Sequence, residues 1–284
     1  MYTSMKPILA KANQGGYAVL AVNTFNLETS KAVIEIAEEN HAPIIIDLLQ
    51  EHLQNHLDFK YLRDGLITMC NEAKVEVAIN LDHGKNVAHT KQMLYQGMKS
   101  VMIDASVLPI DENIAITKQI VKLAECFDAS VEAEVGAMGS IAQSNWTSEA
   151  MYTKPDEAIQ FIKATGVDCL AISFGTTHGD YPEGYQPEFR FEIVKAIKEA
   201  TGLPLVVHGS SGAGFENLAQ SVKSGINKIN VGSDIMKAQR DYLLYTIEAD
   251  RTVEYPNLIH GTIQAAKDEI QKYLNISGSI NQSL

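Results

Sequence analysis

The sequence of 284 residues has few cysteines, more acidic than basic residues and no long hydrophobic run. Its three cysteines (Cys70, Cys126 and Cys169) are odd in number and form no CxxC pair, which predicts a reduced, cytoplasmic protein with buried thiols. A net charge of -12 argues against a nucleic-acid or anionic-membrane surface, although backbone N–H groups can still bind a phosphate locally. No stretch is long and apolar enough to span a bilayer, and the N-terminal segment lacks the apolar run of a signal peptide.

The sequence also lacks linkers, repeats and low-complexity segments. We therefore expect one domain over residues 1–284, with a C-terminal tail and a closing helix from about residue 251, although this length could hold two domains. Short apolar, β-branched runs predict eight strands, at Ala18–Val22, Pro43–Asp47, Val77–Leu81, Ser100–Ile103, Ser130–Glu134, Cys169–Ser173, Leu205–Val207 and Lys228–Asn230. Helical periodicity lies at Leu27–Asn40, Tyr61–Ala73, Val87–Gln96, Asn113–Phe127, Pro155–Thr165, Glu192–Ala200 and Phe215–Ser224, with the closing helix near Gly261–Leu274. This alternation predicts an α/β fold, a (β/α)8 TIM barrel, with a doubly wound open sheet as the alternative.

Polar residues gather at the ends of the predicted strands. In chain order they are Asn23, Asp82, His83, Asp104, Glu134, His178, His208 and Asn230. In a barrel all of these ends lie at the C-terminal face, where barrel enzymes place their active sites. The pattern therefore predicts an active site at that face.

Three of these residues are histidines that each follow an apolar run. They are His83 in AINLDHG, His178 in LAISFGTTHG and His208 in LPLVVHG. Three imidazoles at one mouth predict a metal site with an open position, which is typical of catalytic zinc, and we favour zinc over cobalt or iron. Asp104 and Glu134 are either further ligands or groups that orient the histidines. Helix capping or a salt bridge is the alternative for both carboxylates.

Asp82 precedes His83 directly. Adjacent side chains at a strand end diverge, so we expect His83 to hold the metal while Asp82 faces a substrate as a general acid or base. The alternative is that Asp82 caps a helix that begins near Gly84.

Two loops rich in small residues follow the last two predicted strands, HGSSGAG (208–214) and KINVGSD (228–234). These are the loops in which barrels commonly bind phosphate, because small residues let backbone N–H groups approach an anion. Ser211 and Ser233 would add hydroxyl donors. The alternative is that the glycines only serve turns.

With these residues the chain resembles the class II, zinc-dependent ketose-bisphosphate aldolases, in particular the branch of fructose- and tagatose-bisphosphate aldolases. The resemblance runs from about Tyr17 to about Asp234 and rests on NLDHG, SVMIDAS, SVEAEVG, YTKPDEA, FGTTHGDY, VVHGSSG and KINV in family order.

The resemblance implies that Asp82 is the catalytic acid/base, that His83, His178 and His208 bind zinc, and that Asp104 and Glu134 serve alternative or second metal positions. The expected substrate-binding residues are Asn23, Gly179, Gly209, Ser210, Ser211, Asn230, Gly232 and Ser233. A monovalent cation (Na⁺ or K⁺) is implied near Gly179 and Ser211. The implied reaction is reversible cleavage of a ketose bisphosphate to dihydroxyacetone phosphate and an aldehyde, in carbohydrate metabolism such as glycolysis. The family also implies a homodimer or homotetramer.

The chain departs from the family pattern at several positions. Relatives carry Gly-Gly-x-Glu-Asp after the Glu134 segment, whereas this chain reads Gly139-Ser-Ile-Ala142-Gln143, with Glu149 as a distant substitute. NVGSDIM places Met236 at a position that is basic in relatives, and Leu49 stands where a small hydroxyl residue is common. Because a charge-assisted contact to phosphate contributes roughly 1.5–3 kcal/mol, these changes favour a substrate without a distal phosphate, either a ketose 1-phosphate or a keto-deoxy acid phosphate.

Two other classes of protein remain as alternatives. A zinc hydrolase could use the same histidines to activate water, but the two phosphate loops argue against it. A non-catalytic phosphosugar-binding relative would fit Ala142 and Met236, but it would have no chemical need for Asp82 and the histidines.

Overall fold

The computed structural model describes residues 1–136, 152–177, 179, 181 and 187–283. Its strands are β1 (Tyr2–Thr3), β2 (Val19–Asn23), β3 (Ile44–Leu49), β4 (Val77–Gly84), β5 (Ser100–Ile103), β6 (Ser130–Val135), β7 (Cys169–Ile172), β8 (Leu205–Val207) and β9 (Ile226–Val231). Its helices are α1 (Met5–Gly15), α2 (Leu27–Glu39), α3 (Gln50–Asn55), α4 (Phe59–Glu72), α5 (Val87–Tyr95), α6 (Ile110–Ala124), α7 (Pro155–Thr165), α8 (Phe191–Thr201), α9 (Phe215–Ser224), α10 (Ser233–Ala249) and α11 (Tyr255–Ser277), with a 3-10 turn η1 (Glu125–Phe127).

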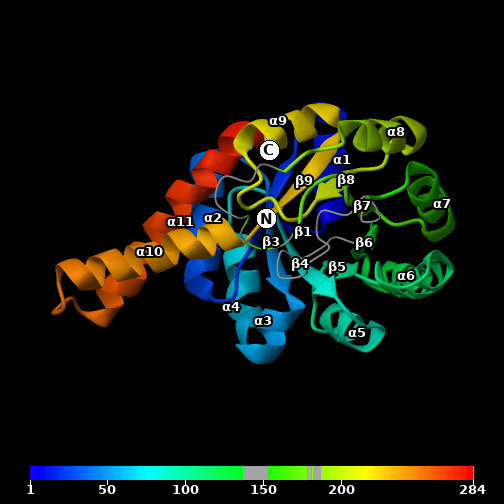
Figure 1. Cartoon of the computed structure of the whole chain (residues 1–284). Coiled ribbons are helices and arrows are strands. Elements are labelled where there is room, and N and C mark those ends of the chain that lie inside the picture. Colours follow the sequence, from blue (N-terminus) through cyan, green and yellow to red (C-terminus); the bar gives the residue numbers. More distant parts are fainter. Residues whose placement is uncertain (137–151, 178, 180, 182–186, 284) are drawn as a thin grey trace.

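The strands β2 to β9 form a closed parallel barrel. They follow the order β4-β3-β2-β9-β8-β7-β6-β5, and a β4–β5 pairing closes the ring. Helices surround the strands (Figure 1). The predicted TIM barrel is therefore confirmed, and the open doubly wound sheet is wrong because β4 and β5 pair. The short β1 pairs in parallel with the N-terminal end of β4, which β5 leaves uncovered.

The inner face of the barrel changes from apolar to polar along the strands. Side chains two residues apart point the same way, so Ile45 and Asp47 share a face on β3, as do Ala78 and Asn80 on β4. The apolar members of these pairs pack with α1 in one buried cluster: Met5, Ile8, Leu9, Ala12, Tyr17, Val19, Ala21, Ile45, Ala78, Cys169, Ala171 and Val206. The helix α1 therefore fills the N-terminal end of the barrel, and the polar members lie toward the C-terminal mouth.

The elements differ from the sequence-based expectation in several places. The structure adds β1, α1, α3 and α10, and α11 begins before the predicted closing helix. Strand β4 continues through Asp82 and His83 instead of ending at Leu81. Helix α2 begins at the predicted residue, where the side chain of Asn26 accepts a hydrogen bond from the N–H of Thr29 at 2.9 Å.

Helix α10 and the start of α11 form an arm that extends away from the barrel (Figure 1). Of the residues of α10, only Ile235 and Gln239 are buried, and both lie in its N-terminal half. Helix α10 packs against α11, and the other side of its far half is exposed.

None of the helices in the described ranges is long and apolar enough to cross a membrane. The cysteines form no disulfide with one another; Cys70 and Cys169 are buried as expected, whereas Cys126 is exposed. The expectation of buried thiols is thus wrong for Cys126, which follows α6 on the outside of the barrel.

Candidate active site

A cavity of about 210 Å³ lies at the C-terminal mouth of the barrel. It brings together eleven residues that the sequence predicts for the site: Asn23, Asp82, His83, Gly179, His208, Gly209, Ser210, Ser211, Asn230, Gly232 and Ser233. Leu49, His52 and Met236 line the same cavity. His52 does not lie at the end of a predicted strand, so the strand-end pattern does not select it, but the structure places it at the cavity.

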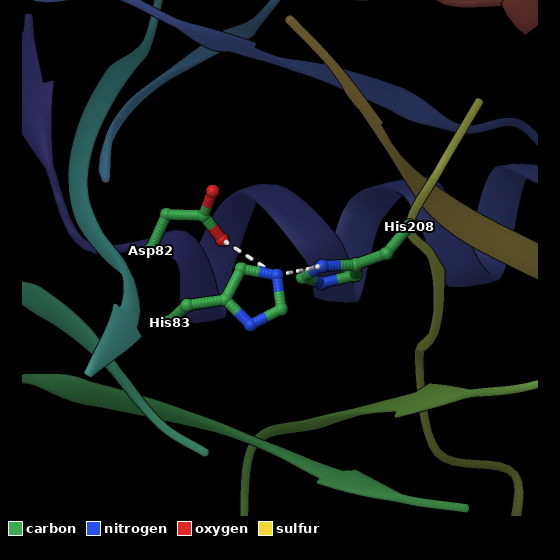
Figure 2. Close-up of side chains that lie close together, drawn as sticks. All are labelled: Asp82, His83 and His208. Atoms are coloured by element: carbon green, nitrogen blue, oxygen red, sulfur yellow. Dashed lines mark hydrogen bonds and ion pairs between the residues drawn. The ribbon is translucent and has the colours of Figure 1, made fainter. Parts of the chain in front are cut away.

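Asp82 and His83 point into the cavity together because β4 is irregular at this point. The pairing of β4 with β5 shifts register between Leu81 and Gly84, and His83 has a φ of 47°. A bulge of this kind redirects a side chain that would otherwise face away. Asp82 Oδ1 lies 3.9 Å from His83 Nε2, and Figure 2 shows both side chains directed toward His208. The expected divergence of the two neighbours is therefore wrong.

The imidazoles of His83 and His208 meet edge to face. His83 Nε2 lies 3.0 Å from His208 Nδ1, and the ring planes are inclined at 80° (Figure 2). Burial alone would lower the pKa of His83, but the carboxylates of Asp82, Asp104 and Glu134 outweigh it and raise the pKa to about 9. Burial lowers the pKa of His208, which is therefore neutral at pH 7.

Two side-chain amides hold the carboxylate of Asp82. Asn23 donates to Oδ2 at 2.7 Å, and Asn230 donates to Oδ1 at 3.4 Å. Burial would raise the pKa of Asp82, but the positive charges of His83 and Lys228 and the Asn23 hydrogen bond lower it to about 2. Asp82 is thus an ionised, buried carboxylate at the edge of the cavity and does not cap a helix.

Asp104 and Glu134 lie on the other side of His83. Asp104 Oδ2 is 2.9 Å from His83 Nδ1 and also pairs with Lys85. Asp104 therefore orients His83 and forms a salt bridge at the same time. Burial and the charge of Asp104 raise the pKa of Glu134 to about 8, and Glu134 Oε2 has no hydrogen-bond partner among the described residues.

Among the described residues, two buried groups of donor atoms could hold a metal ion, and His83 belongs to both. One consists of Asp82, His83 and His208, and the other of His83, Asp104 and Glu134; within each group the donor atoms lie within 4.8 Å of one another. Imidazole nitrogens and carboxylate oxygens suit zinc, and the unpartnered Glu134 oxygen leaves a donor for it. His178 lies outside the described residues, as do Gly139, Ala142, Gln143 and Glu149.

The two predicted phosphate loops form one wall of the cavity. Ser210 Oγ and Asn230 Oδ1 are buried and have no hydrogen-bond partner among the described residues. Gly209 has a φ of 64°, and a Cβ there would lie 2.5 Å from the carbonyl oxygen of Thr177, so only glycine fits this turn. Helix α10 begins at Ser233, and its N-terminus is a favourable place for an anion.

Sequence reasoning missed three buried charges below the histidines. His208 Nε2 is 2.8 Å from Glu132 Oε1, and Lys228 Nζ lies 2.8 Å from Glu132 Oε2 and 3.2 Å from Asp47 Oδ2. Asp47 interrupts the otherwise apolar strand IIIDLL, and Glu132 and Lys228 lie inside SVEAEV and INKINV. A charge inside a parallel strand needs a partner, and that signal could have identified them.

Comparisons with known proteins identify the family. The model of the class II fructose-bisphosphate aldolases matches residues 3–282. The chain is 28% identical to the YdjI aldolase from Escherichia coli K12, with 100% of both chains covered and a TM-score of 0.88. A protein proposed to be a fructose-1,6-bisphosphate aldolase from Coccidioides immitis is 26% identical over 97% of this chain and 96% of that one, with a TM-score of 0.85.

A third structure, the fructose-bisphosphate aldolase from Campylobacter jejuni, is 18% identical over 99% of this chain and 96% of that one, with a TM-score of 0.82, and supports the fold alone. The family model, by contrast, covers almost the whole sequence. Together with the barrel, this match establishes that the chain belongs to the class II fructose-bisphosphate aldolases, a family of metal-dependent aldehyde-lyases.

Proposed function

We propose that this aldolase cleaves a ketose 1-phosphate without a distal phosphate, reversibly, to dihydroxyacetone phosphate and an unphosphorylated aldehyde. The observation that carries the proposal is the charge of the cavity. Among the described residues that line it, none is lysine or arginine. A second phosphate would therefore lack the cationic partner that usually binds one.

The other side chains that line the cavity support the same conclusion. Leu49 and Met236 present apolar side chains to the cavity, and His52 lines it from α3. Burial lowers the pKa of His52, so this histidine is neutral at pH 7, and its Nδ1 has no partner among the described residues. A neutral imidazole suits the hydroxyl groups of an aldose better than a phosphate.

His83 and His208, together with His178 as the sequence predicts, would hold the metal, and we favour zinc. Asp104 and Glu134 orient His83 or bind the metal in a second position. When bound, the metal supplies a Lewis acid that polarises the ketose C2 carbonyl and stabilises the negative charge that develops on cleavage. The buried carboxylates of Asp82, Asp104 and Glu134 favour the binding of a metal cation at this site.

Asp82 takes the proton of the C4 hydroxyl as the C3–C4 bond breaks. Its low pKa keeps it ionised at pH 7, and Asn23 and Asn230 fix its carboxylate while leaving it within the cavity. In the synthesis direction the same carboxyl returns the proton.

The substrate phosphate lies between the loops that contain Gly209–Ser211 and Gly232–Ser233. The unpartnered Ser210 hydroxyl donates to it, and the N-terminus of α10 adds backbone N–H donors. Asn230 Oδ1 is left to accept a hydrogen bond from a substrate hydroxyl.

The alternatives fit the site less well. Fructose- or tagatose-1,6-bisphosphate would place a second phosphate beside Leu49 and Met236. A zinc hydrolase would have no use for a phosphate-binding wall next to an apolar one. A phosphosugar-binding protein without activity would have no reason to bury an ionised Asp82 against two histidines, because burial of a charge is costly.

We also propose that the chain forms a homodimer or homotetramer through its arm. Four large hydrophobic residues near the far end of the arm are exposed: Leu244 at 61%, Tyr245 at 75%, Ile247 at 45% and Tyr255 at 72%. Exposed apolar residues gathered on one extension favour contact with a second copy.

Release of dihydroxyacetone phosphate by the zinc-loaded protein tests the proposal. The substrates are fructose-1,6-bisphosphate, tagatose-1,6-bisphosphate and a series of ketose 1-phosphates of increasing length. We expect kcat/KM to be highest for a monophosphate, and Asp82→Asn to lower the rate by about 10²- to 10⁴-fold. Equal or better cleavage of a bisphosphate would refute the monophosphate preference, and no release from any substrate would favour the hydrolase or the binding protein.

A further inference from the structure

A continuous row of buried polar contacts runs from the cavity into the middle of the barrel. It begins at His208, passes through Glu132 and Lys228, and ends at Asp47 and Asn80. Asn80 Nδ2 donates to Asp47 Oδ1 at 2.9 Å. All five side chains have at most 1% exposure, and they come from five different strands or strand ends.

The direction of each hydrogen bond in this row follows from Lys228. An ammonium group has only donors, so both contacts of Lys228 are donated, one to Glu132 Oε2 and one to Asp47 Oδ2. Glu132 forms a salt bridge to Lys228 through Oε2, and an ionised carboxylate has acceptors only. The remaining oxygen, Oε1, therefore accepts the contact from His208 Nε2.

The proton of neutral His208 is thereby assigned to Nε2, and its Nδ1 carries the lone pair that faces His83 at 3.0 Å. We propose that Glu132, held in place by Lys228, is a positioning residue that fixes this tautomer so that Nδ1 is the atom His208 offers to the metal. The inference rests on the proposed metal-binding role of His208. Carboxylate partners of this kind commonly fix the orientation of ligating histidines.

Glu132→Gln is the informative variant because Lys228 can only donate. Lys228 would take the amide oxygen of the new side chain, which leaves the NH₂ group facing His208 Nε2. That nitrogen would then have to accept, so the proton of His208 would move to Nδ1, the atom required for the metal. A nearly isosteric change thus reverses the tautomer.

Asp47→Asn provides a matched control. It removes the same negative charge next to the same lysine but does not touch His208. Its amide can be accommodated, since Asn80 Oδ1 is buried without a partner among the described residues and becomes an acceptor when the Asn80 amide flips. Any effect of buried charge alone should therefore appear equally in both variants.

The experiment combines long-range ¹H–¹⁵N spectra of the histidines in metal-free protein with zinc affinity from chelator competition. We expect Nε2-protonated His208 in the wild type and in Asp47→Asn, and Nδ1-protonated His208 in Glu132→Gln. We expect zinc affinity to fall by about 10- to 100-fold in Glu132→Gln and to stay unchanged in Asp47→Asn.

Three results would overturn the proposal. They are an Nδ1-protonated His208 in the metal-free wild type, an unchanged tautomer in Glu132→Gln, and an equal loss of zinc affinity in Asp47→Asn. The first needs no variant, so it decides the matter even if Glu132→Gln does not fold. None of the readouts requires cleavage of a sugar, and a failure of the proposed substrate would leave these results unaffected.

Discussion

Neighbouring carboxyl groups in this site are held in opposite protonation states. Asp82 receives hydrogen bonds from two amides and faces positive charges, so its pKa falls to about 2. Glu134 lies fully buried beside the charge of Asp104, so its pKa rises to about 8. Environments that push the pKa values of two carboxyl groups apart in this way make the group with the low pKa the base. The other group stays neutral until a cation replaces its proton.

The stability of the metal-free protein should therefore fall with rising pH. The pKa of Glu134 rises from 4.5 to about 8 through burial and Asp104, and that of His83 rises from 6.5 to about 9 because nearby carboxylates outweigh its burial. Between the ordinary and the raised values the folded protein binds more protons than the unfolded chain, so stability decreases as pH increases. We expect Tm of the chelator-treated protein to drop by several degrees between about pH 6 and pH 9, measured by calorimetry.

Glu134→Gln is the control for this effect, since a glutamine has no proton to lose. We expect its Tm to depend less steeply on pH than that of the wild type, and zinc to flatten the wild-type curve by taking the place of the protons. A Tm that rises over this pH range would contradict the assignment of both groups.

Among the elements, strand β4 contains a bulge at His83 that the sequence could not predict. Alternating strands and helices predict the barrel and place Asp82, His83 and His208 at one mouth, because the C-terminal ends of parallel strands meet there. The bulge at His83 depends on how β4 pairs with β5, which no local pattern encodes. Helix α10 was missed because only two of its residues are buried and exposed apolar residues such as Leu244 and Tyr245 obscure its helical pattern.

The bulge makes Gly84 a sensitive position. A Cβ there would lie 2.3 Å from the carbonyl oxygen of Met102 and 2.6 Å from Thr90 Oγ1, so β4 and β5 would have to separate. We expect Gly84→Ala to cost about 1–3 kcal/mol of stability and to lower zinc affinity, because His83 and Asp104 lie on the two strands that move. Denaturant unfolding and chelator competition measure the two effects.

Gly166→Ala is the comparison for Gly84→Ala. Gly166 ends α7 with a φ of 71° and has open space around it, so alanine there costs about 1–2 kcal/mol through backbone strain alone. We expect its zinc affinity to match that of the wild type. If both variants lost affinity to the same degree, general destabilisation would explain the result.

The first turn of α10 should decide whether a distal phosphate is accepted. Met236 lines the cavity from this turn, and an arginine there would supply the cation that the described wall lacks. A charge-assisted hydrogen bond of about 1.5–3 kcal/mol corresponds to roughly a 10- to 100-fold gain. We expect Met236→Arg to raise kcat/KM for fructose- or tagatose-1,6-bisphosphate by that factor relative to a ketose 1-phosphate.

Ala238→Arg adds the same charge to α10 at a residue that does not line the cavity. It should leave the ratio of the two kcat/KM values unchanged. A loss of activity on both substrate types in Met236→Arg, with no change in their ratio, would argue against Met236 as a determinant of the distal end.

At the scale of the whole molecule, the arm exposes large apolar side chains that its own chain does not cover. Leu244 and Tyr245 are 61% and 75% exposed on α10, and Tyr255 is 72% exposed at the start of α11. We expect Leu244→Glu combined with Tyr245→Glu to shift the protein to the mass of a monomer in sedimentation velocity, because burial of two carboxylates at an apolar contact is strongly unfavourable.

The matched control is Tyr61→Glu on α4, because Tyr61 is 70% exposed on the barrel and not on the arm. An exposed aromatic residue on its own is ordinary, so Tyr61→Glu should leave the mass unchanged. The arm differs in that several such residues share one extension, which is where a second copy would have to bind. A wild-type protein that sediments as a monomer at micromolar concentration, or an arm variant with an unaltered mass, would remove the arm as the site of assembly.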